Sequence, residues 1–336
     1  MEDLNHTAIA VIKYPKGATI IAAASAVIFI FLGIFGNALT IVALSKCPKL
    51  KMQATTWFVI SLSVSDMIFC SFNLPLTATR FIYEAWIFND YLCKCFPFFF
   101  YANFGASLYH IMLIAVNRYM LISSYITYKR VYRPLYVVIM IAAVWLISFC
   151  MLLPPLLGIW GNMGLDEETF SCTILKKDGS SPKKFLFLFG ILPPFLIVLF
   201  CYTRILLSVR RSKMVLRRIQ ESTGAPCNTS TVKKDDLKLT KTMILIFGGF
   251  VLCFVPLMVV NVIDEKISIP TIHVTASILA WASAVINPII YSISSKTYRN
   301  AYMVALGIKR STNYARAATS GTAKTTTSDS GNAFAL

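Results

Sequence analysis

Seven long apolar segments, separated by short polar stretches, set the pattern of this 336-residue chain. Each is long enough to cross roughly 30 Å of hydrocarbon, which takes about 20 residues of helix. Backbone exposed to lipid must satisfy its own hydrogen bonds, and the segments lack the alternating polar positions of a membrane barrel. The pattern therefore predicts an all-α membrane protein, a seven-transmembrane helix bundle. The predicted spans are 19–45, 55–80, 92–123, 134–157, 184–209, 239–263 and 270–293.

The sequence outside these spans predicts three regions. Residues 295–306 place Tyr298, Tyr302 and Leu306 four positions apart, which predicts a short amphipathic helix on the inner leaflet. Beyond it the chain is rich in Ser, Thr, Ala and Gly, a composition typical of disorder. We expect an extracellular N-terminus at 1–18, a membrane domain at 19–306 and a disordered cytoplasmic tail at 307–336.

Composition and charge favour the same assignment. The chain is 57% hydrophobic and only 14% charged, yet its formal net charge is +17. If the N-terminus is outside, most Lys and Arg fall in the inner loops and tail, as the positive-inside rule requires. Because these basic residues are divided among loops beside anionic lipid, a nucleic-acid partner is not expected. Asn5 begins an outer Asn-His-Thr sequon and is the predicted glycosylation site.

Two cysteines are candidates for an extracellular disulfide. Cys93 lies at the outer start of the third span, and Cys172 lies in the second outer loop. A bond between them would hold that loop over the mouth of the bundle in an oxidising compartment. Cys95 is an alternative to Cys93, and the sequence leaves both pairings open.

Polar residues are rare inside the spans, so each is a candidate for function. Arg118 closes the inner end of the third span within Asn117-Arg118-Tyr119, and a charge beside hydrocarbon is costly unless it has a role. The alternative is an arginine that snorkels and only anchors the helix end. Asp66 lies in the middle of the second span, where a carboxylate must be paired, hydrated or protonated.

Oxygen-bearing residues of other spans could surround Asp66. Ser107, Ser283 and Asn287, with Asn37, could lie at the same depth. Hard cations prefer oxygen ligands, so this set predicts a site for a monovalent cation such as sodium, and no other cofactor is expected. The alternative is a hydrogen-bonded polar core that fixes the register of the helices.

Further landmarks lie in order along the spans. They are Asn37, Asp66 within Leu-Ser-x-x-Asp, Cys93, Arg118, Trp145, Pro194 with Tyr202, Cys253-Phe254-Val255-Pro256 and Asn287-Pro288-Ile289-Ile290-Tyr291. Together they resemble the rhodopsin-like G-protein-coupled receptors over residues 19–306. Asn117, where most such receptors have an acid, resembles the melatonin receptors and the invertebrate Moody and Trapped-in-endoderm receptors. Pro288, where melatonin receptors have Ala, favours the invertebrate group.

The resemblance implies signalling across the plasma membrane to a heterotrimeric G protein, with arrestin as a further partner. An agonist would move the sixth helix outward about Pro256, and Phe250 and Phe254 would transmit the motion. Phe254 replaces the Trp of the family and keeps its bulk without the indole N–H. The implied switch residues are Asn117, Arg118, Tyr119, Tyr202, Asp236, Asn287, Pro288 and Tyr291.

Asn117 changes one part of this scheme. In relatives the preceding carboxylate restrains the arginine, but Asn117 cannot ionise, so protonation of this site cannot be the trigger. Asp236, or else Asp235, is the acid of the sixth helix expected to pair with Arg118.

The resemblance also locates a ligand pocket. Phe100 stands where amine receptors have an Asp, and Trp281 stands where opsins have the retinal lysine, so neither kind of ligand is expected. An apolar or lipid-like ligand fits the remaining lining better. The alternative is that many of these aromatic residues face lipid or a neighbouring helix. The implied lining is Phe100, Tyr101, Phe104, Leu186, Leu257, Met258, Asn261, His273, Ser277 and Trp281.

Two other classes of protein remain as alternatives. A receptor-like scaffold or arrestin-biased receptor would bind ligand without activating a G protein, which Asn117 suggests. A transporter would use Asp66, but the seven spans show no internal repeat of the kind transporters carry. The sequence contains no phosphate loop, nucleophile motif or metal-spaced His/Cys set, so an enzyme is not expected.

Overall fold

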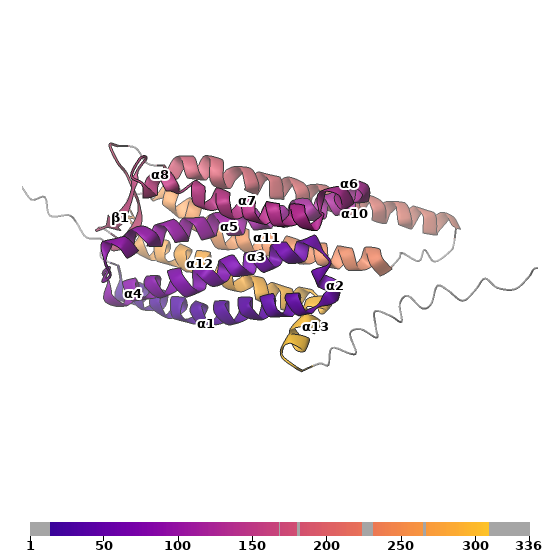
Figure 1. Ribbon diagram of the computed structural model, residues 1–336, viewed down its shortest axis with the longest axis horizontal. Helices are drawn as coiled ribbons and strands as arrows, with labels where there is room; N and C mark the ends of the chain where they lie inside the picture. The colour runs from indigo at the N-terminus through magenta and orange to yellow at the C-terminus, as the bar shows by residue number, and fades with distance from the viewer. Residues whose placement is uncertain (1–13, 168, 180–181, 224–230, 265–266, 309–336) are drawn as a thin grey trace, which may run out of the picture.

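Long helices run side by side along the longest axis of the computed structural model (Figure 1). It describes residues 14–308 apart from 168, 180–181, 224–230 and 265–266, so Asn5 and the predicted tail lie outside the described residues. The elements are α1 (Lys16–Lys46), α2 (Pro48–Lys51), α3 (Ala54–Ile68), the π-helix η1 (Phe69–Asn73), α4 (Leu74–Tyr83), α5 (Asp90–Ser123), α6 (Tyr125–Val131), α7 (Pro134–Cys150), α8 (Leu153–Leu156), β1 (Asn162–Asp166), β2 (Ser171–Leu175), α9 (Lys183–Phe185), the π-helix η2 (Leu186–Ile191), α10 (Leu192–Thr223), α11 (Thr231–Ile263), α12 (Pro270–Ser294) and α13 (Lys296–Ala305).

The predicted helical membrane fold is confirmed. Six helical stretches of the described chain are long and apolar enough to cross a bilayer, and α11 adds a shorter apolar stretch at Ile244–Val260. The second span is built from α3, η1 and α4 in succession, and the fifth from η2 and α10. α10 extends well past the other helices at the end of the bundle opposite to β1 and β2, which is called the inner end after the predicted orientation (Figure 1). The six are Lys16–Lys46, Ala54–Tyr83, Asp90–Ser123, Pro134–Leu156, Leu188–Arg211 and Pro270–Ser294.

Small residues bring α1 close to its neighbours. Ala22 and Ala26 are fully buried and belong to a cluster with residues of α4 and α12. A Cβ added at Gly33 would overlap the sulfur of Cys70 on η1, so a larger residue would separate these helices. Within lipid, where apolar surface alone does not drive helices together, such close packing is a main source of association.

A β-hairpin covers the outer end of the bundle. β1 pairs with β2 in antiparallel fashion, and Met163 faces Ile174 across the pair. Both side chains are buried against Ala102 of α5 and Leu152. The hairpin lies at the end of the bundle opposite to α2, α6 and α13 (Figure 1).

Helix α13 lies where the amphipathic helix was predicted, but two of its three apolar residues pack on protein. Tyr298 and Tyr302 are buried, and the Tyr302 hydroxyl shares a 2.9 Å hydrogen bond with Thr40 Oγ1 of α1. Leu306 follows the last helical residue and is exposed. The helix is therefore held to the bundle by its tyrosines, with Leu306 left outside.

Candidate functional site

The inner end of α5 buries Asn117 and Arg118 against the start of α3. Thr55 Oγ1 donates a hydrogen bond of 2.6 Å to Asn117 Oδ1. Arg118 Nη2 donates to Gln53 Oε1 at 3.5 Å, and only 2% of Arg118 is exposed. Asn117 is thus held to a neighbouring helix by an uncharged hydrogen bond, because its amide side chain cannot ionise.

Two tyrosines of the predicted switch are buried in the bundle. Tyr202 of α10 is buried, and its ring lies 5.8 Å from that of Phe247 on α11, centroid to centroid. Tyr291 of α12 is fully buried and stacks on Tyr298, with ring centroids 5.0 Å apart. Neither the Tyr202 nor the Tyr291 hydroxyl has a hydrogen-bond partner among the described residues. The site therefore contains two polar groups whose hydrogen-bonding capacity is unused.

The other predicted switch residues lie in different parts of the molecule. Tyr119 points to α10, where its ring meets Phe200 edge-on at 6.0 Å. Pro288 is buried in α12 and would contact a Cβ at Gly36 of α1. The side chains of Asp235 and Asp236 lie outside the described part of the structure.

Asp66 is the centre of a buried polar site at the middle of the bundle. Asn287 Nδ2 donates to Asp66 Oδ2 at 2.8 Å, and Ser107 Oγ donates to Oδ1 at 3.1 Å. Ser283 lines the same cavity of about 20 Å³, although its hydroxyl donates to the Ala280 carbonyl. Asn37 is engaged elsewhere, because its amide donates to the carbonyls of Gly33 and Ala284.

The composition of this cavity fits a small cation. Carboxylate and hydroxyl oxygens from three helices face it, and they are the ligands that hard cations prefer. Its volume is sufficient for one water molecule or one small ion. Asp66, Ser107 and Ser283 would hold the ion, and its charge would balance the buried carboxylate.

The polar network continues toward the outer face through residues that the sequence did not single out. Ser65 Oγ donates to Asn103 Oδ1 at 3.3 Å, and Asn103 also lines the Asp66 cavity. Asn103 Nδ2 donates to Asn73 Oδ1 at 3.5 Å, and Asn73 donates to the carbonyl of Phe96 at 3.1 Å. The four-residue spacing of Asn103 and Ser107 is the signal that could have revealed this face of α5.

Aromatic side chains close the cavity above Asp66. Phe100, Phe104, Phe254 and Trp281 all line it. Phe104 lies 4.2 Å from Phe254, centroid to centroid, and stacks on Phe250 at 5.9 Å. The predicted transmission residues of α11 therefore contact the wall of the cavity directly.

Other residues of the predicted ligand lining lie apart from this cavity. The Tyr101 hydroxyl shares a 3.2 Å hydrogen bond with Thr173 of β2, and His273 Nε2 lies 3.3 Å from Asp264 Oδ2. Leu186 packs under the hairpin. Leu257, Met258 and Ser277 are partly buried but do not line the cavity, and the side chain of Asn261 is not among those described.

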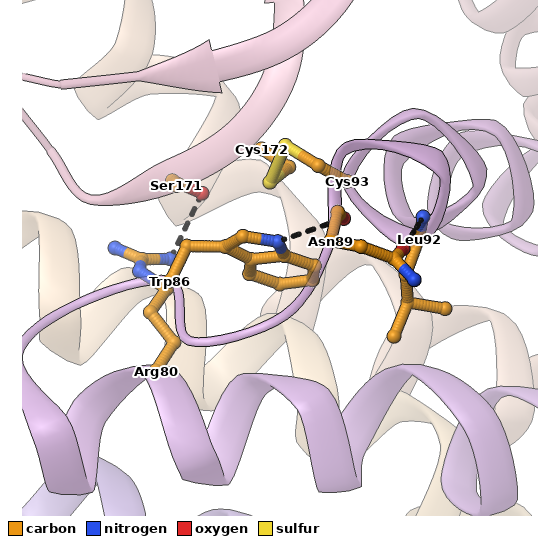
Figure 2. Close-up of a disulfide and its surroundings, with 7 residues drawn as sticks. All are labelled: Arg80, Trp86, Asn89, Leu92, Cys93, Ser171 and Cys172. Atoms are coloured by element: carbon orange, nitrogen blue, oxygen red, sulfur yellow. Dashed lines mark hydrogen bonds between the residues drawn. A yellow bond between two sulfur atoms is a disulfide. The ribbon is translucent and has the colours of Figure 1, made fainter.

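The disulfide joins Cys93 to Cys172, which decides between the two predicted pairings; Cys95 is free and exposed. Figure 2 shows the bond beside Trp86, with Arg80 of α4 reaching Ser171. Arg80 donates to Ser171 Oγ at 3.0 Å and to the Thr169 carbonyl at 3.1 Å. Two independent attachments thus hold the hairpin on the bundle.

A disulfide-bound hairpin at one end of a helical membrane bundle, a buried arginine at the other and a polar, aromatic-walled cavity between them are features typical of a transmembrane receptor. Residues 36–291 match the family described as 7 transmembrane receptor (rhodopsin family). The chain belongs to this family of G-protein-coupled receptors, and its relatives are receptors rather than enzymes.

Individual relatives agree with this assignment. The chain is 47% identical to Protein trapped in endoderm-1 of Drosophila melanogaster over 305 residues, covering 86% of this chain and 78% of that protein. It is 34% identical to G-protein coupled receptor moody of the same fly, covering 84% of this chain and 50% of the relative, and 26% identical to human Melatonin receptor type 1B, covering 86% and 80%. Squid rhodopsin has the same fold, with a TM-score of 0.76 at 24% identity over 88% of this chain and 87% of that one.

Proposed function

We propose that this receptor carries an extracellular signal across the plasma membrane to a heterotrimeric G protein, with its N-terminus outside. The observation that carries the proposal is the pair of buried phenols, Tyr202 and Tyr291, whose hydroxyls have no hydrogen-bond partner among the described residues. A buried polar group without a hydrogen bond costs about 1–3 kcal/mol. A rearrangement that pairs both phenols would recover much of this cost, so a second state of similar free energy is accessible.

Movement of α11 provides that rearrangement. Pro256 interrupts the internal hydrogen bonds of α11 and allows it to bend there. Phe254 and Phe250 connect this bend to Phe104 at the ligand cavity. A ligand that displaces Phe104 would therefore favour bending of α11. Outward movement of the inner end of α11 would then expose Arg118 to a G protein.

The contact that restrains the resting state at Asn117 is an uncharged hydrogen bond, whereas an acid at this position would form an ion pair. The Thr55–Asn117 bond is neutral, and a neutral bond contributes about 1 kcal/mol where a charge-assisted one contributes more. Little energy is then needed to release the inner end of α5. We expect a measurable signal in the absence of agonist.

The ligand is proposed to be apolar or lipid-like. The space above Asp66 is only about 20 Å³ in this structure, so the ligand would occupy it by displacing the aromatic side chains that form most of its walls, Phe100, Phe104, Phe254 and Trp281. A ligand for this site must gain its affinity from buried apolar surface. The hairpin lid above it favours a compound that partitions into the membrane.

The Arg118→Ala variant tests the G-protein proposal. In cells that express each class of Gα in turn, we expect the wild-type receptor to raise the agonist-free signal of at least one class. Arg118→Ala should return that signal to the level of empty vector while surface expression, measured by antibody, is largely retained. Arg204→Ala, which removes an exposed arginine of α10, serves as the matched control and should signal normally. Unchanged coupling of Arg118→Ala would refute the proposal.

One observation favours a second function. Asn117 lacks the charge of the family motif, which is consistent with a receptor that recruits arrestin, or acts as a scaffold, without activating a G protein. Arrestin recruitment in the same cells separates the two functions. Recruitment with no Gα response in any class would favour the second.

A further inference from the structure

An apolar groove opens on the outside of the bundle between α11 and α12. Its volume is about 210 Å³. Thr275 and Leu279, which form part of its wall, are exposed, so it faces outward rather than into the ligand cavity. The walls include Pro256 and Val260 of α11 and Thr271, Thr275, Ala276 and Leu279 of α12.

The sequences of the two helices explain why the groove exists. Pro256 lies inside α11 and distorts the helix, because it lacks an N–H and its ring crowds the preceding turn. Opposite this point α12 presents Ala276, whose side chain is too small to fill the space. One turn further along α12, Ala280 lines the ligand cavity, so the groove and the cavity share a thin wall.

The surroundings of the groove identify what can occupy it. It lies between the membrane-spanning parts of α11 and α12, and it continues the exposed apolar face formed by Val255 and Val259. The residues that line it carry no charge, and the Thr275 hydroxyl already donates to the Thr271 carbonyl at 2.9 Å. A flexible, uncharged hydrocarbon chain matches these walls, because the described lining offers no charge and little polar surface to a water-soluble ligand.

We propose that this groove is a binding site for one acyl chain of a membrane phospholipid, separate from the ligand cavity. The chain lies against Pro256, at the point where α11 can bend. A lipid in this position contacts both helices and changes the free energy of separating them. The receptor thereby responds to the lipid that surrounds it as well as to its agonist.

Photolabelling of the full-length receptor in phosphatidylcholine nanodiscs tests the site. The probe is phosphatidylcholine with a diazirine in one acyl chain, and cross-linked peptides are mapped by mass spectrometry. We expect labelling of residues 256–260 and 271–279 to saturate as the mole fraction of probe rises. Labelling of the exposed face of α7 should instead increase in proportion to the mole fraction of probe, as it does for lipids in non-specific contact.

Two variants distinguish a site from general lipid contact. Thr275→Phe fills the groove from its exposed rim and removes only a hydrogen bond within α12, so the receptor should fold. Labelling of the groove in this variant should no longer saturate and should rise in proportion to the mole fraction of probe, as on α7. Ala142→Phe adds the same ring to the exposed face of α7 and should leave the saturable labelling intact.

The proposal is overturned if wild-type labelling of the groove does not saturate, or if Thr275→Phe is labelled like the wild type. An unfolded variant is recognised by its thermal unfolding profile, and Ala276→Leu then fills the groove from its floor. The readout needs no G protein, so its outcome is independent of the coupling experiment on Arg118.

Discussion

At the scale of single residues, the cost of burying a polar group explains the main features of this receptor. Asp66 satisfies both of its oxygens with Asn287 and Ser107, whereas Tyr202 and Tyr291 leave their hydroxyls unpaired. The hydrogen bonds of Asp66 stabilise the bundle. The unpaired phenols raise the free energy of this state, and a change of state that pairs them would recover that cost. Asn117 combines the two, because Thr55 satisfies its oxygen without any charge while its amide Nδ2 has no hydrogen-bond partner among the described residues.

Asp66→Asn tests the cation site at this scale. We expect sodium chloride to raise the melting temperature of the purified wild-type receptor above its value in choline chloride of equal ionic strength. A ligand at 100 times its dissociation constant stabilises a folded protein by about 2.7 kcal/mol. Asp66→Asn lacks the carboxylate that the ion would balance, so the two salts should give the same melting temperature. A sodium effect that survives in Asp66→Asn would show that the ion binds elsewhere.

At the scale of elements, helix ends and short connections position the site. α5 carries residues of the ligand cavity at one end and Arg118 at the other, so one rigid helix spans the distance between them. α12 begins after a loop in which Asp264 accepts hydrogen bonds from the backbone N–H groups of Ser268 and Ile269, at 2.8 and 2.9 Å. His273 of α12 then lies beside the same carboxylate.

The Asp264 cap predicts a specific dependence on pH. The backbone N–H groups of Ser268 and then Ile269 lower the pKa of Asp264 from 3.8 to about 2. Because the folded pKa lies below the unfolded one, the carboxylate stabilises the fold above pH 3.8, and this contribution disappears as the pH falls toward 2. We expect the wild-type melting temperature to decrease in this window by more than that of Asp264→Asn.

A matched control identifies the cap as the cause. Asp178→Asn removes an acidic residue from the loop after β2, and it should keep the steeper wild-type profile. If Asp264→Asn and the wild type lose stability in parallel, the cap does not contribute in the way proposed.

At the scale of the whole molecule, the bundle has a hairpin at its outer end and the proposed switch at its inner end. The disulfide and Arg80 hold the hairpin in place, and α13 holds the inner ends of α1 and α12 together through Tyr302 and Tyr298. The polar network from Asn73 to Asn287 runs between them. Packed side chains therefore connect the two ends, and they are the route that the proposed signal would take.

Removal of the disulfide tests the lid at this scale. Cys93 and Cys172 are separated by 79 residues, for which loop-closure entropy predicts roughly 4 kcal/mol of stabilisation. We expect Cys172→Ala to lower both the melting temperature and the surface expression. Cys95→Ala should have no such effect, because its thiol is free and exposed. Equal losses in the two variants would mean that the disulfide does not stabilise the outer end.

The pattern of apolar and polar residues was enough to predict the helices and their order, and it marked out the candidate functional residues. Hydrocarbon imposes helical structure on any long apolar segment, and it makes each buried polar residue, such as Asp66 or Arg118, visible as an exception. Local spacing also predicted the position of α13. It did not reveal that its tyrosines pack on α1 and α12, because that depends on neighbours distant in the sequence.

Which of these residues meet follows from the packing of the helices and could not be read from local patterns. This packing selected Cys93 over Cys95, assigned Thr55 to Asn117, and separated Phe104 and Trp281 at the cavity from Tyr101 and His273 outside it. The hairpin and the groove beside Pro256 have no pattern of their own in the sequence, since both arise from the way separate elements pack. A buried polar residue shows in the sequence that it needs a partner, and the fold supplies that partner.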